Sequence, residues 1–230
     1  MKKSFFSPSI KSAAILAALL TLAVFGKGIA SSVMTVPIGK PTDGPPEGWK
    51  VKEWKGMASF SVVEADFGPA VHMKSSSTSS ALYKEMKFDI KDYPYLSWQW
   101  KVTALPDGGD VRRKDRDDQA AQVYVVFPRF PAAVNSRLVG YIWDSTAPAG
   151  LRVQSTKTVK TRYIVLRSGP GELGKWLEEE RNVYEDYKAL FKEEPPKAGS
   201  VSVMIDSDDT KGAAESFVGS IVFSKEPAAK

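Results

Sequence analysis

Short strand-like runs, separated by turn residues, divide most of this chain and constrain its fold more than any other feature. In one run, Leu82, Met86 and Phe88 share one face, while Glu85 and Lys87 share the other, as in a half-buried antiparallel strand. Gly, Pro, Asn, Asp and Ser separate the runs, which favours a sandwich over a helical or alternating fold. We predict an all-β fold, a two-layer antiparallel β-sandwich resembling a jelly roll. The predicted strands lie at 49–54, 58–65, 70–75, 80–90, 95–103, 120–127, 137–143, 159–166, 200–205 and 216–223.

One segment, residues 172–192, has helical periodicity instead. Acidic residues begin it, lysines close it, and Pro195 and Pro196 prevent its extension. We predict one amphipathic α-helix here, packed over one end or one face of the sandwich; a partner-binding helix is the alternative. The apolar residues at helical spacing are Leu173, Trp176, Leu177, Val183, Tyr184, Tyr187, Leu190 and Phe191.

The N-terminus has the three parts of a secretory signal. Lys2, Lys3 and Lys11 form a basic region, residues 13–25 are mostly apolar, and small residues follow where a signal peptidase would cut. A spanning helix needs about 20 predominantly apolar residues, and this run is shorter. We therefore predict that residues 1–30 are a signal peptide, with a retained membrane anchor as the alternative.

Charge and cysteine content limit the partners and the compartment. Residues 1–30 hold four lysines and no acid, so their removal from 32 Lys and Arg leaves 28 against 27 Asp and Glu, a net charge of about +1. Nucleic-acid binding usually needs a basic face, so we expect no nucleic-acid partner. The absence of cysteine fits an oxidising compartment.

Together these features predict an exported protein, periplasmic or secreted, with no stable membrane span after signal cleavage. An extended, proline-containing lead-in at 31–47 precedes a single sandwich domain at 48–225.

No set of residues identifies a reaction. His72 is the only histidine, so a multi-histidine metal site cannot form, and no G-x-S-x-G nucleophile motif exists. The sequence therefore leans against an enzyme.

Two places are candidates for ligand binding. Trp98 and Trp100 project from one face of the run 95–103. Core packing explains such a row, whereas exposure on a concave sheet would make it an aromatic platform for sugar rings. The long charged loop at 105–119, with Arg112 and Arg113, is the second candidate surface.

Aspartates at the strand ends are candidates for a metal site. If the runs 120–127 and 137–143 form a hairpin, residues just before the first run lie beside those just after the second. Antiparallel placement of 200–205 beside either run could bring a third group to the same rim or to the opposite one. Converging carboxylates suit Ca²⁺, which takes six to eight oxygen ligands, although Asp is also a common turn former. The candidate calcium ligands are Asp117, Asp118, Asp144, Asp206 and Asp208.

Several ordered blocks resemble a known family. PYLSWQWKV, GGD followed by KDRDDQAAQVYVVF, GYIWDS and IDSDDTKGAAESFVGSIVF are similar to those of an exported bacterial family, domain of unknown function 3047, over about residues 48–223. The resemblance implies a bacterial envelope protein with a β-sandwich fold and no established activity. It supplies no catalytic residues.

Two function classes follow. The first is a non-catalytic module that binds glycans or other envelope components, and the second is a polysaccharide hydrolase or lyase that uses carboxylates as acid and base on a jelly-roll fold. Binding is preferred because no carboxylate has a spacing that marks it as catalytic. The ligand and the oligomeric state are left open.

Overall fold

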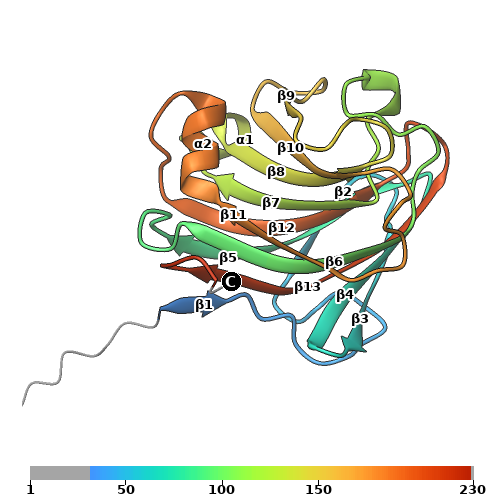
Figure 1. Ribbon diagram of the computed structural model, residues 1–230, viewed down its shortest axis with the longest axis horizontal. Coiled ribbons are helices and arrows are strands. Elements are labelled where there is room, and N and C mark those ends of the chain that lie inside the picture. Colours follow the sequence, from blue (N-terminus) through green and yellow to red (C-terminus); the bar gives the residue numbers. More distant parts are fainter. Residues whose placement is uncertain (1–31, 229–230) are drawn as a thin grey trace, which may run out of the picture. The chain divides into compact units, whose positions relative to one another are not determined.

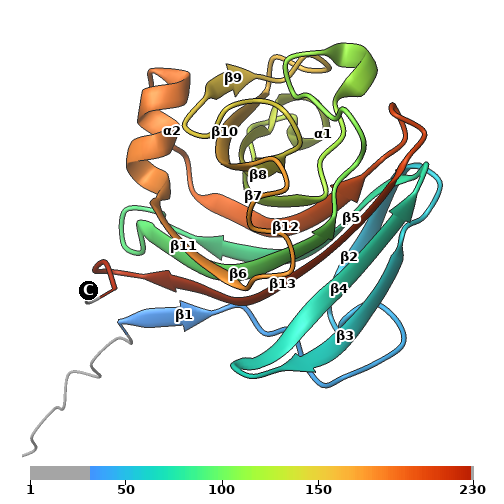
Figure 2. The ribbon, with the colours of Figure 1, turned by 45° about the vertical axis from the view of Figure 1, so that its right-hand side comes forward.

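Two β-sheets pack face to face in residues 32–228, the part of the chain that the computed structural model describes (Figures 1 and 2). This confirms the predicted all-β, two-layer sandwich. The predicted signal peptide at 1–30 lies outside the described residues.

The first sheet has six strands. β1 pairs with β13 beside the main path of the sheet, and every pairing within it is antiparallel. In order, the sheet contains β11 (Leu177–Asn182), β6 (Tyr95–Ala104), β13 (Ala213–Ser224), β4 (Gly68–Ser76) and β3 (Ser59–Ala65), with β1 (Val33–Thr35) beside β13.

The second sheet has seven strands and ends on β2 at one edge and on β9 at the other. Each of the predicted runs corresponds to a strand in one of the two sheets. In order, this sheet contains β2 (Lys50–Lys55), β5 (Ser79–Phe88), β12 (Ala198–Asp206), β7 (Ala121–Phe127), β8 (Arg137–Asp144), β10 (Thr161–Ser168) and β9 (Arg152–Gln154).

One pairing differs from the antiparallel expectation. β8 and β10 run parallel, because the connection 145–160 carries the chain back along the sheet before β10 begins. Parallel neighbours require a crossover of this kind, whereas a tight turn joins antiparallel ones. The connection contains β9, which pairs antiparallel with β10 at the sheet edge.

Tryptophans and tyrosines join the two sheets in the core. On β6, Trp98 and Trp100 are 1% and 0% exposed. The ring centroid of Trp98 lies 5.3 Å from that of Tyr141, and that of Trp100 lies 6.0 Å from that of Trp143, both partners being on β8 of the other sheet. The run 95–103 therefore points its aromatic face inward. Between the two sheets these indole rings lose nearly all contact with water, which stabilises the fold more than exposure on the surface would.

The predicted helix is present but shorter than 172–192. α2 spans Val183–Phe191, and the Asn182 side chain caps it by accepting a hydrogen bond from the Glu185 backbone N–H at 3.0 Å. The preceding residues form β11, which pairs with the free edge of β6. Backbone pairing along that edge outweighs the helical periodicity of the first half of the segment. α2 lies at one end of the sandwich (Figure 1), where Tyr187 packs on Phe127 at a centroid distance of 4.6 Å.

The expected lead-in at 31–47 contributes directly to the sandwich. It contains β1, and the buried Val36 and Ile38 belong to the main core. The Trp49 indole N–H donates to the Pro37 carbonyl at 2.9 Å. Within residues 32–228, no helix combines the length and the apolar character needed to cross a membrane.

Candidate binding pocket

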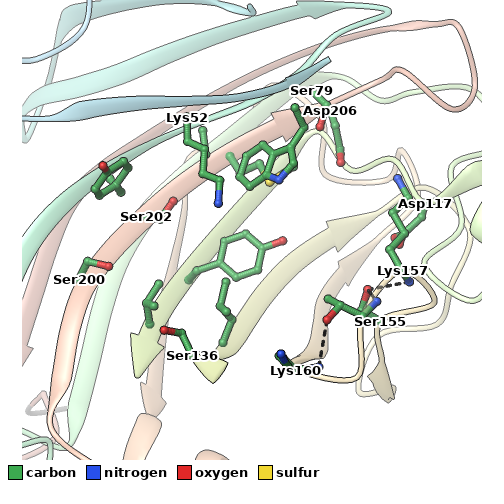
Figure 3. Close-up of a pocket in the computed structure, with 18 of the residues that line it drawn as sticks. Lys52, Ser79, Asp117, Ser136, Ser155, Lys157, Lys160, Ser200, Ser202 and Asp206 are labelled. Atoms are coloured by element: carbon green, nitrogen blue, oxygen red, sulfur yellow. Dashed lines mark hydrogen bonds between the residues drawn. The ribbon is translucent and has the colours of Figure 1, made fainter. Parts of the chain in front are cut away.

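An open pocket of about 940 Å³ lies on the outer face of the seven-stranded sheet (Figure 3). Its floor is formed by side chains of β5, β12, β7, β8 and β10 that point away from the core. β2 forms one wall, and α1 (Ala132–Asn135) with the loop 155–160 forms the other. We call this the sheet pocket.

Strand alternation explains why polar side chains reach the floor. On β12, Val201, Val203 and Ile205 are buried in the core between the sheets. The intervening residues therefore face outward and line the sheet pocket, namely Ser200, Ser202, Met204 and Asp206.

The walls carry exposed apolar side chains. Trp54 of β2 is 55% exposed and lines the sheet pocket together with Val51 and Val134. Val159, also exposed, belongs to the loop 155–160 of the opposite wall, although it does not line the pocket itself. Exposed apolar side chains gathered around one concavity mark a surface that binds something.

A chain of hydrogen bonds runs beneath the sheet pocket. The Tyr124 hydroxyl donates to the Gln122 side-chain oxygen, and the Gln122 amide donates to Asp206 Oδ1 at 2.7 Å. Asp206 Oδ1 also accepts from the Gln119 backbone N–H at 2.7 Å. The Tyr163 hydroxyl lies 3.5 Å from that of Tyr124. These hydrogen bonds hold the buried polar side chains of the floor in fixed positions.

Two carboxyl groups at one end of the sheet pocket are almost fully buried. Asp117 accepts hydrogen bonds from the side chains of Gln119 and Thr156 at 3.1 and 3.2 Å. Burial raises the pKa of Asp117 to about 6 and that of Asp206 well above its ordinary value. Both groups thereby hold a proton more tightly than an exposed aspartate.

The strand pairing assumed for the predicted calcium site is present in the structure. β7 and β8 pair antiparallel, and the end of β12 meets the start of β7. Asp118, Asp208 and Asp209 each offer an oxygen, and these oxygens lie within 4.8 Å of one another. Of the predicted ligands, Asp117, Asp206 and Asp208 line the sheet pocket. The calcium site stays a prediction.

The hydrogen-bond partners of Asp118 and Asp144 are those of turn-forming residues. Asp118 accepts from the backbone N–H groups of Asp209 and Thr210 at 3.1 and 2.6 Å. Asp144 accepts from those of Val111, Thr146 and Ala147 at 2.6–2.9 Å. The two carboxylates therefore hold different loops at this end of the sheet, although their strands are neighbours.

The predicted aromatic platform is wrong. Trp98 and Trp100 are enclosed between the sheets, because the face of β6 that carries them is the core face. Arg112 and Arg113 lie on the surface, outside the sheet pocket, and form ion pairs within their own loop. Arg112 binds Asp110 through two hydrogen bonds of 2.8 Å, and Arg113 pairs with Asp115 at 3.0 Å.

Sequence reasoning missed the residues that give the sheet pocket its character, above all Trp54, Lys52 and Lys160. The sequence KVKEWK of β2 alternates weakly, and all six residues are exposed. The available signal was a tryptophan in a lysine-rich run that has no apolar face. A strand of the core would have such a face, so this tryptophan was a candidate for exposure.

The sandwich can now be placed among known proteins. A family model described as "Protein of unknown function (DUF3047)" matches residues 47–222. The chain belongs to this family. The resemblance seen in the sequence blocks is thereby confirmed, and the matched region contains every described residue that lines the sheet pocket.

Solved structures give more distant similarities. A family 11 carbohydrate-binding module from Clostridium thermocellum, in complex with a β-1,3-1,4-mixed-linked tetrasaccharide, is 10% identical with a TM-score of 0.45, over 84% of this chain and 96% of that chain. A family 30 carbohydrate-binding module of a C. thermocellum cellulosomal cellulase is 9% identical with a TM-score of 0.49, over 85% and 99%. An adhesin domain of Lys-gingipain from Porphyromonas gingivalis is 9% identical with a TM-score of 0.40, over 86% and 100%. No curated protein matches the chain.

Proposed function

We propose that this protein is an exported glycan-binding module and that the sheet pocket is its binding site. The observation that carries the proposal is the exposed indole of Trp54 at the wall of an open pocket whose floor carries hydroxyl and carboxyl groups. Sugar rings have apolar faces that stack on indoles and hydroxyl groups that need hydrogen-bond partners. The sheet pocket offers both.

The geometry also suits an extended ligand. The pocket volume, about 940 Å³, lies at the upper end of the range of small-molecule sites, and the pocket spans the sheet from β2 to the loop 155–160. Ser200 and Ser202 supply hydroxyl groups on its floor, and Figure 3 shows them side by side along β12. A rigid sheet carries these groups, so little conformational entropy is lost on binding.

The test is binding of the purified protein to a glycan array, followed by titration of the best ligand. We expect Trp54→Ala to weaken binding at least tenfold, about 1.4 kcal/mol or more, because truncated tryptophans dominate many binding sites. Met57→Ala is the matched control, since Met57 is 61% exposed and lies outside the sheet pocket. Equal binding by wild type and Trp54→Ala would place the site elsewhere.

One observation favours the second candidate, hydrolysis of a polysaccharide in the same pocket. Asp117 and Asp206 both line one end, and burial keeps them protonated at higher pH than ordinary aspartates, which a general acid requires. The measurement is release of reducing ends from the glycan that binds best. Hydrolysis by the wild type and none by Asp117→Asn, with binding retained, would favour the enzyme.

A further inference from the structure

Lysines outnumber aspartates among the charged side chains of the sheet pocket. Of the described residues that line it, four are lysines, three are aspartates, and none is arginine or glutamate. The lysines stand on the two walls, and the aspartates lie where β7 begins and β12 ends. The residues are Lys52 and Lys55 of β2, Lys157 and Lys160 of the loop 155–160, and Asp117, Asp206 and Asp208.

Two of the lysines already have carboxylate partners. Lys55 Nζ lies 3.7 Å from Asp208 Oδ2, and Lys157 Nζ lies 2.5 Å from Asp209 Oδ2. These pairs place positive charge beside the acidic end of the pocket. They leave Lys55 and Lys157 committed to the protein itself.

The other two, Lys52 and Lys160, form no ion pair with any carboxylate of residues 32–228. Lys52 Nζ stands over the Trp54 ring, 4.8 Å from its centroid. Figure 3 shows the two lysines on opposite sides of the sheet pocket. Each ammonium group therefore keeps its charge available to a ligand that lies between the walls.

The aspartates do not cancel this charge. Figure 3 shows Asp117 and Asp206 toward one end of the sheet pocket and Lys52 and Ser202 away from it. Burial also raises the pKa of all three aspartates, that of Asp117 to about 6, so each is harder to ionise than an exposed aspartate. The part of the pocket beside Trp54 is therefore positive.

A neutral and an acidic glycan would differ sharply here. A neutral chain that covered the pocket would remove water from Lys52 and Lys160 and give them no anion in return, which is unfavourable. A chain that carries carboxylates would supply charge-assisted hydrogen bonds to the same two groups. The two unpaired lysines therefore disfavour a neutral glycan as well as attract an acidic one.

Building on the proposed glycan binding, we propose that the ligand is an acidic polysaccharide whose uronate carboxylates pair with Lys52 and Lys160, while a neighbouring sugar ring contacts Trp54. The proposal names the chemical class, a carboxylate-bearing sugar polymer.

The experiment uses calorimetric titration of the purified protein with alginate, polygalacturonate and hyaluronate, each also in its carboxyl-reduced, neutral form. The pocket variant is Lys52→Ala plus Lys160→Ala. The control variant is Lys40→Ala plus Lys175→Ala, which removes the same charge from two exposed lysines outside the sheet pocket. Polyglutamate serves as a polyanion without sugar, and a melting curve of each variant confirms that it is folded.

We expect at least one acidic polymer to bind tenfold or more tightly than its reduced form. The pocket variant should lose tenfold or more of that affinity, the control variant should lose little, and added salt should weaken binding. Equal binding of the reduced polymer would overturn the acidic preference and leave glycan binding intact. Equal binding of polyglutamate, or binding of no glycan at all, would overturn the proposed function together with this inference.

Discussion

Aspartates in this protein have two kinds of surroundings, although they look alike in the sequence. Asp118 and Asp144 accept backbone N–H groups and hold turns in place. Asp117 and Asp206 line the end of the sheet pocket, and burial raises the pKa of both, as it does that of Asp144. All four carboxyl groups are buried, so what separates them is whether they face the pocket or a loop.

Asp117 should make stability depend on pH. Its pKa is about 6 in the folded protein and 3.8 ordinarily, so the folded state binds the proton more tightly, and the free energy of unfolding falls as pH rises from about 4 to 6. The shift of about two pH units corresponds to about 3 kcal/mol at most. Asp117→Asn cannot ionise, so we expect the variant to gain about 1–3 kcal/mol relative to wild type between pH 4 and pH 7. Urea unfolding of both proteins at the two pH values measures this, and parallel pH profiles would contradict it.

Two of the three carboxylates that could hold a cation at the acidic end already form ion pairs with lysines. Lys157 pairs with Asp209 and Lys55 with Asp208, while both oxygens of Asp118 accept backbone N–H groups. We therefore expect millimolar calcium to leave the melting temperature unchanged relative to a chelator, since a ligand stabilises only through net binding to the folded state. A rise of several degrees that disappears in Asp208→Asn would instead establish the calcium site predicted from the sequence.

Among the elements, the edge strand β2 supplies four residues that line the sheet pocket, as many as β12 does. All six of its residues are exposed, and three of them are lysines. Charged side chains on an edge strand discourage pairing with another chain, so Lys50, Lys52 and Lys55 protect the sheet edge. Lys52 and Lys55 also face the pocket, so one short strand both protects the sheet edge and carries residues of the proposed binding site.

The floor of the sheet pocket depends on a glycine in β8. A Cβ atom at Gly140 would lie 2.7 Å from Tyr124 Cε1 and 2.9 Å from Tyr163 Cδ1. We expect Gly140→Ala to displace these rings and to lower the free energy of unfolding by about 1–3 kcal/mol, despite the better strand propensity of alanine. Gly171→Ala is the control, because nothing lies within 4 Å of a Cβ there. Chemical denaturation of the two variants should separate them, and equal stability would show that the floor can relax.

On the scale of the whole molecule, the two sheets have different roles. The six-stranded sheet places Trp98 and Trp100 against Tyr141 and Trp143, which anchors the seven-stranded sheet from behind. The outer face of the seven-stranded sheet can then carry polar and charged groups, because the core on its other side supplies the stability. A rigid support of this kind preorganises a binding surface.

Export is a prediction about the whole chain. The basic and apolar segments of residues 1–30 predict cleavage close to Ser31. Expressed in a Gram-negative host, the protein should appear in the periplasmic fraction, and N-terminal sequencing should begin near that residue. An intact Met1 terminus in the membrane fraction would show a retained anchor instead.

The sequence by itself determined ten of the strands in residues 32–228, because alternation of apolar and polar side chains is visible within each run. It also placed Asp118 and Asp144 at one rim through the hairpin between them. Only the tertiary structure decided that Trp98 faces inward and that residues 177–182 form β11 beside β6 and do not extend α2. It also decided that Trp54 and Lys160 line the same pocket. The physical reason is common to all three: each depends on which surface lies opposite, and that surface comes from residues far away in the chain.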